Sequence, residues 1–63
     1  MENFYLMRLV NGFNHWFNSD KFPKELEKAD VEECVLAWAD YAEVDLVDNL
    51  DELCKKIVEF GIC

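Results

Sequence analysis

The segment from Asp30 to Cys54 most constrains what this chain can fold into, because it combines dense negative charge with a regular apolar pattern. Nine of its residues are Asp or Glu, and none is Lys, Arg or His. Apolar residues nevertheless recur in it at the three- and four-residue spacing that places side chains on one face of a helix. They are Val31, Cys34, Val35, Trp38, Tyr41 and Ala42. This pattern predicts a packed helix with a negative outer surface.

The composition indicates one small globular domain over residues 1–63. Apolar residues make up 52% of the chain and aromatic residues 14%, which is too apolar for a disordered segment despite the formal charge of −8. A chain of this length buries only about 60% of the surface that its unfolded form exposes. We therefore expect uncovered apolar surface in a monomer, which favours a homodimer or another partner.

Residues 3–18 allow two interpretations. Asn11-Gly12 between apolar runs is typical of a hairpin turn, but that hairpin would mix charged and apolar side chains on each face. A helix instead gathers Leu6, Leu9, Val10, Phe13, Trp16 and Phe17 on one face and leaves Phe4 and Met7 outside it. Burying six large side chains, at about 1.5–3 kcal/mol each, outweighs the cost of about 1 kcal/mol that Gly12 imposes. We predict the helix.

The middle of the chain predicts one short helix and one long one. Pro23 suits the start of a short helix over Pro23–Lys28, which Phe22 and Leu26 would anchor. Asp30 is a suitable N-cap for a helix from Val31 to about Glu43. Leu36 falls on the outer side of that helix, so we expect a large apolar side chain in water.

The C-terminal part predicts a loop and a last helix. Residues 43–46 alternate as a short strand would, but no partner strand is evident, so we expect residues 44–47 to form a loop with Leu46 and Val47 turned inward. The last helix runs from Leu50 to Phe60, is capped by Asp48 or Asn49, and ends at Gly61. Its inward residues are Leu50, Leu53, Cys54, Ile57 and Phe60.

The predicted fold class is therefore all-α: a compact bundle of three main helices plus one short helix, either alone or as a homodimer. We expect its core or dimer contact to be aromatic, formed by Phe13, Trp16, Phe17, Trp38, Tyr41 and Phe60.

No set of residues predicts an enzyme, a cofactor or a metal site. The single histidine, His15, has no nucleophile or carboxylate beside it except Ser19 and Asp20. The acids at positions 45, 48 and 51 lack the two-residue spacing and the glycine of a calcium loop. Three cysteines without Cys-x-x-Cys spacing argue for free thiols in a reducing compartment, with a Cys34–Cys54 disulfide as the open alternative.

The charge distribution restricts the partners. Residues 1–24 carry three basic and two acidic residues, a net of +1, and residues 25–63 carry three basic and twelve acidic residues, a net of −9. Such a field opposes direct binding to nucleic acid or an anionic membrane and attracts a basic protein. The apolar run Phe4–Val10 lacks the basic flank of a signal peptide and is too short to span a membrane, so we expect a cytoplasmic protein.

The acidic residues around Leu36 are the candidate functional site. A row of carboxylates on one helix can imitate a phosphate backbone and occupy a groove that a protein uses for DNA or RNA. Leu36 in their midst would be an apolar anchor ringed by charge, as in an interface hot spot. The predicted partner-binding residues are Glu32, Glu33, Leu36, Asp40, Glu43, Asp45 and Asp48.

The charge pattern favours a non-catalytic inhibitor or regulator of a basic, nucleic-acid-binding protein. Small acidic helical proteins with this role are often encoded by phages, where they block host restriction or CRISPR, and such a protein would act in the host cytoplasm. That analogy is one of class and concerns no particular residues. The alternative is a helical adaptor or dimerisation module that binds its partner through exposed apolar residues such as Phe4, Met7 or Leu36.

Overall fold

The computed structural model describes residues 4–46 and 48–62 and is helical wherever it has regular structure. Its elements are α1 (Phe4–Phe17), the 3-10 helix η1 (Lys24–Leu26), α2 (Val31–Ala42) and α3 (Leu50–Glu59), with no strand in the described part of the chain. The all-α prediction is confirmed, and residues 4–17 are a helix and not a hairpin. The Cα radius of gyration is 10.9 Å, close to the value of about 10.6 Å for a compact chain of this length.

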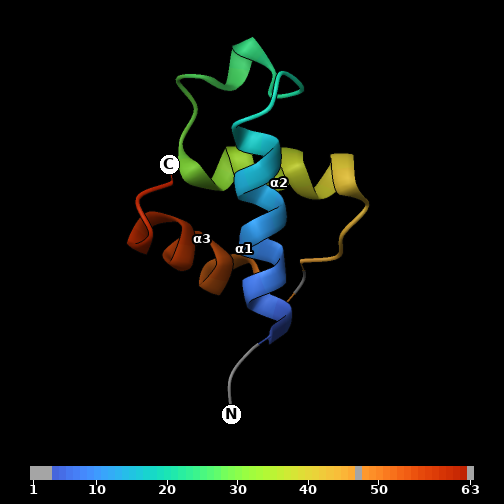
Figure 1. The fold of residues 1–63 in the computed structure, drawn as a ribbon, viewed down its shortest axis with the longest axis vertical. Coiled ribbons are helices and arrows are strands. Elements are labelled where there is room, and N and C mark those ends of the chain that lie inside the picture. Colours follow the sequence, from blue (N-terminus) through green and yellow to red (C-terminus); the bar gives the residue numbers. More distant parts are fainter. Residues whose placement is uncertain (1–3, 47, 63) are drawn as a thin grey trace.

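The core lies where α1 crosses the other two α-helices. Figure 1 shows α1 running along the long axis of the molecule, with α2 and α3 crossing it. The predicted apolar face of α1 is confirmed, since five of its six residues are buried and Phe17 is half-buried. The buried side chains are Leu6, Leu9, Val10, Phe13, Trp16, Cys34, Val35, Trp38, Ala39, Leu46, Leu53 and Ile57.

At Gly12, α1 leaves room for the Trp38 side chain of α2. A Cβ atom at this position would lie 2.9 Å from Cζ2 of Trp38, so no larger residue fits without movement of the indole. The ring of Phe13 meets the same indole edge-on, with the two centroids 6.1 Å apart. Glycine therefore weakens α1 as a helix but lets Trp38 reach the core.

A side-chain cap and residues with left-handed backbone conformation define the ends of α2 and α3. Asp30 is the N-cap of α2 as predicted, and its Oδ1 accepts a hydrogen bond from the backbone N–H of Glu33 at 3.0 Å. Gly61 has φ 72° and ends α3, where the N–H of Ile62 donates to the carbonyl of Ile57 at 3.1 Å. The same left-handed ending closes α2, but there Glu43, with φ 57°, occupies the position that usually belongs to glycine.

Three side chains that we predicted to turn inward are exposed. Tyr41 and Phe60 are 58% and 50% exposed, and Ala42 is also exposed, while Ala39 is buried instead. Tyr41 and Ala42 belong to the last turn of α2, which extends past α1 (Figure 1), and Phe60 follows the last turn of α3. Periodicity gave these residues the right direction around the helix, but the described neighbouring elements leave the helix ends largely uncovered. Tyr41 keeps a ring contact with Trp16, at a centroid distance of 6.0 Å.

The remaining predictions hold with smaller changes. The short helix is only the 3-10 turn Lys24–Leu26, with Pro23 as its N-cap residue, and Phe22 and Leu26 pack against the core as expected. Leu46 is buried in the loop, whereas Val47 lies outside the described residues. No disulfide joins Cys34 to Cys54. The homodimer stays a prediction.

Candidate protein-binding face

The outer side of α2 gathers five of the seven predicted partner-binding residues on one surface. At 100° per residue, the four that lie within α2 project within an arc of about 100° opposite the buried Trp38, and Glu43 follows them as the C-cap residue. All five are exposed, including Leu36 at 47%. We call this surface the acidic face of α2; it consists of Glu32, Glu33, Leu36, Asp40 and Glu43.

The buried side of α2 determines which way the acidic face points. Val35 is fully buried, and Trp38 packs its indole against Gly12 and Phe13 of α1, so rotation of the helix about its axis is prevented. The N-cap Asp30 sets the start of the helix, and Glu32 and Glu33 then fall in the first turn, where the helix dipole favours negative charge. The acidic face is thus held by rigid structure on a length of about 15 Å.

No basic side chain neutralises the acidic face within the part of the chain that the structure describes. The ion pair within 4.0 Å there joins Nζ of Lys56 to Oε1 of Glu59 at 3.4 Å, and both residues belong to α3. The carboxylates of Glu32, Glu33, Asp40 and Glu43 make no such pair among the described residues. Their charges are therefore directed to solvent and screened only by salt.

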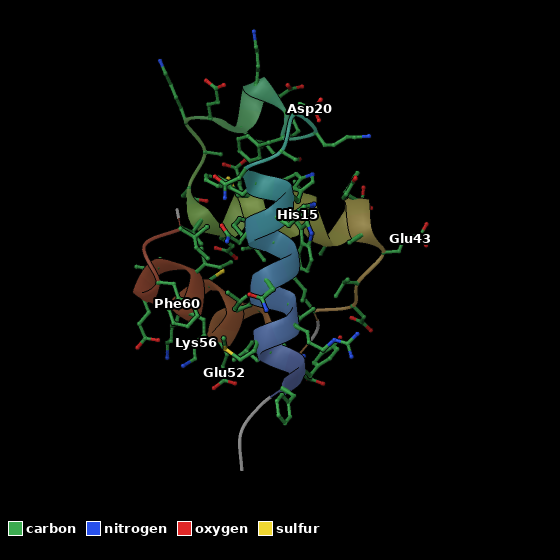
Figure 2. The ribbon with its side chains drawn as sticks, viewed as in Figure 1. His15, Asp20, Glu43, Glu52, Lys56 and Phe60 are labelled. Atoms are coloured by element: carbon green, nitrogen blue, oxygen red, sulfur yellow. The ribbon has the colours of Figure 1, made fainter. Side chains whose placement is uncertain are left out.

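The structure does not place Asp45 and Asp48 on this helix. Both are exposed, but they belong to the segment that leads from α2 to α3, after the chain has left the helix at Glu43. Figure 2 shows Glu43 at the far end of α2, where this segment begins. These two acids extend the negative charge beyond the helix without sharing its regular spacing.

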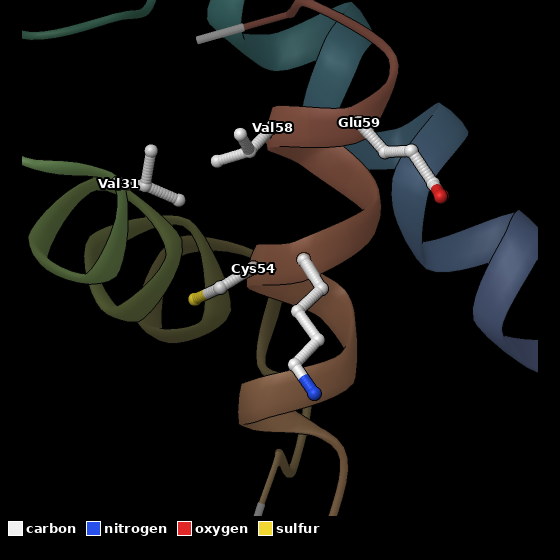
Figure 3. Close-up of a pocket in the computed structure, with 5 residues that line it drawn as sticks. Val31, Cys54, Val58 and Glu59 are labelled. Atoms are coloured by element: carbon white, nitrogen blue, oxygen red, sulfur yellow. The ribbon is translucent and has the colours of Figure 1, made fainter.

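Sequence reasoning missed an open apolar groove between the start of α2 and α3. Its volume is about 520 Å³, and Figure 3 shows Val31 on one side facing Cys54 and Val58 on the other, with Lys55 and Glu59 at the edge. Val58 is 57% exposed. The signal available in the sequence was Val58 itself, an apolar residue outside the inward-facing set of the last helix.

Other kinds of site find no support in the described residues. No group of three or more His, Cys, Asp and Glu side chains there could hold a metal ion. Within the same residues, no helix has both the length and the apolar character needed to cross a membrane. No protein-family model, curated protein or solved structure matches this chain.

Proposed function

We propose that this protein is a small non-catalytic inhibitor that binds a basic surface of a nucleic-acid-handling protein and competes there with DNA or RNA. The acidic face of α2 is the contact surface, and Asp45 and Asp48 extend it. A phage-type inhibitor of host restriction or CRISPR, acting in the host cytoplasm, is the biological setting that suits such a protein.

The observation that carries this proposal is the row of exposed, unpaired carboxylates on one rigid helix face. Glu33, Asp40 and Glu43 are exposed, and no Lys or Arg of the described chain lies within 4.0 Å of their carboxylates. A groove lined by Lys and Arg gains binding energy from such an array by releasing counterions, as it does with phosphates. The formal charge of −8 also speeds the encounter with a basic partner.

Leu36 adds an apolar contact to the acidic face of α2. It is 47% exposed in the middle of the acidic face, between Glu32 and Asp40 along the helix. An apolar side chain surrounded by charged residues is desolvated on binding while the charges exclude water from its edge, as in interface hot spots. A basic groove with one apolar depression fits this surface better than a uniformly charged one.

The test is a triple charge reversal, Glu33→Lys, Asp40→Lys and Glu43→Lys. The wild-type protein, immobilised and mixed with nuclease-treated host lysate, should retain a DNA- or RNA-binding protein that added duplex releases. The triple variant should retain none of it. Far-UV circular dichroism should be unchanged, because none of the three side chains contributes to the core.

A matched control separates the acidic face from total charge. The variant Glu25→Lys, Glu27→Lys and Asp51→Lys changes the net charge by the same amount at exposed positions outside the acidic face. It should retain the partner with little loss of affinity. If both triple variants lose binding equally, net charge and not this face is responsible, and the proposal is wrong.

A helical adaptor that binds through apolar surface is the second candidate. Phe4 is 77% exposed at the start of α1, and the groove beside Val58 offers further apolar contact area, while Met7 is half-buried. The dependence of binding affinity on salt concentration distinguishes the two candidate functions. Between 50 and 200 mM salt, an interface of about four phosphate-like contacts should lose affinity by about 100-fold, whereas apolar docking should change little.

A further inference from the structure

A second hollow, distinct from the acidic face, lies where the C-terminal end of α1 meets α2. Its volume is about 360 Å³, and its lining includes His15, Trp16, Asp20, Lys21, Trp38 and Tyr41. Figure 2 shows His15 and Asp20 at the end of α1 that leads toward η1. The hollow combines an aromatic wall with charged groups at its rim, which is the usual make-up of a site for a small ligand.

Trp16 is the most deeply buried aromatic residue in the lining of the hollow. Its side chain is 4% exposed, and its indole Nε1–H has no hydrogen-bond partner among the described residues. The ring is held on both sides, by Phe22 at a centroid distance of 5.1 Å and by Tyr41 at 6.0 Å. The indole nitrogen has less than 1 Å² of accessible surface, so a molecule in the hollow does not reach it.

The rim carries one charge of each sign, held by an ordered turn. The Ser19 hydroxyl donates to the carbonyl of Trp16 at 2.7 Å and accepts from the backbone N–H of Lys21 at 3.1 Å. This turn fixes the backbone on which Asp20 and Lys21 stand, and both side chains are exposed. The local charge of the hollow is thus balanced, in contrast to the strongly negative acidic face.

We propose that this hollow binds a small zwitterion with an apolar side chain, in the class of free aromatic α-amino acids. The ligand carboxylate pairs with the Lys21 ammonium. The ligand ammonium pairs with Asp20, and its apolar part packs against the rings of Trp38 and Tyr41.

The charges of the protein favour a zwitterion over a singly charged ligand. A small anion would use Lys21 but meet Asp20 and the net charge of −8. A small cation would use Asp20 and the aromatic rings but meet Lys21 at the same rim. A ligand with both charges satisfies Asp20 and Lys21 together.

Both tryptophans of the chain line the hollow, so their indole NMR signals should report the binding of a ligand there. L-Phenylalanine, 3-phenylpropionate and phenethylamine share one ring and differ only in which charge they carry. Titrated into the full-length protein, L-phenylalanine should shift the indole ¹H–¹⁵N signal of Trp16 with a Kd on the order of 1 mM. The other two compounds should bind at least about threefold more weakly.

Substitutions at the rim test the separate contributions of Asp20 and Lys21 to ligand binding. Asp20→Asn and Lys21→Gln should each weaken L-phenylalanine binding by about threefold to tenfold, and Lys24→Gln, an exposed lysine outside the hollow, should not. Both rim side chains are exposed, so the fold should persist in each variant. The proposal is overturned if the indole signals do not respond at 20 mM L-phenylalanine, or if 3-phenylpropionate or phenethylamine binds as well.

Discussion

The two sides of α2 differ in their contacts: the inner side packs in the core, and the outer side faces solvent. On the inner side, Val35 is fully buried and Trp38 packs against Gly12 and Phe13 of α1. On the outer side, Leu36 and the carboxylates around it have no part in the core. The inner side should therefore determine stability and the outer side binding, and substitutions on the two sides should separate these properties.

The largest effect is expected at the centre of the inner contact. Phe13 is fully buried and has ring contacts with Trp16, Phe17 and Trp38. Phe13→Ala should cost about 3–5 kcal/mol, which is comparable with the whole stability of so small a domain. Circular dichroism should show a largely unfolded protein at 25 °C. A cooperative transition near the wild-type midpoint would contradict the central place of this ring.

Gly12→Ala tests the close contact between α1 and α2. Alanine favours the helix by about 1 kcal/mol, but its Cβ would lie 2.9 Å from Trp38, and overpacking costs about 1–3 kcal/mol. The net result should be a lower free energy of unfolding, measured by urea denaturation. Asn11→Ala, at an exposed position of the same helix, should have the opposite sign, because it brings the propensity gain without the contact.

Asp30→Ala tests the N-cap of α2, which determines where this helix begins. Loss of the hydrogen bond to the N–H of Glu33 should cost about 1 kcal/mol and lower the melting temperature by about 4–8 °C. Asp30→Asn should keep most of the stability, because asparagine caps a helix about as well. An equal loss in both variants would indicate that charge and not capping is the source of the effect.

The smallest effect on stability is expected on the outer side. Leu36→Ala should change the free energy of unfolding by no more than about 0.5 kcal/mol, yet weaken partner binding by more than about tenfold if Leu36 is the hot spot. Val58→Ala, which truncates an equally exposed apolar residue of α3, is the control and should leave binding unchanged. Binding that survives Leu36→Ala would restrict the interface to charge alone.

Local patterns in the sequence predicted the helices, the Asp30 cap and the exposure of the acidic face correctly. These features depend on residues close in the chain: a side chain three or four positions from its neighbour shares its face, and a cap bonds within its own turn. For the same reason, Leu36 could be placed in water before any fold was known.

The packing of the helices on one another decides which residues of each helix are covered and which residues at its ends stay exposed. Periodicity placed Tyr41, Ala42 and Phe60 on inward faces, but α2 and α3 extend beyond their neighbours there, so these residues meet solvent. The contact of Gly12 with Trp38 and the hollow between α1 and α2 arise from residues far apart in the chain. Local spacing fixes the direction of a side chain, whereas its burial depends on where the crossing helices end.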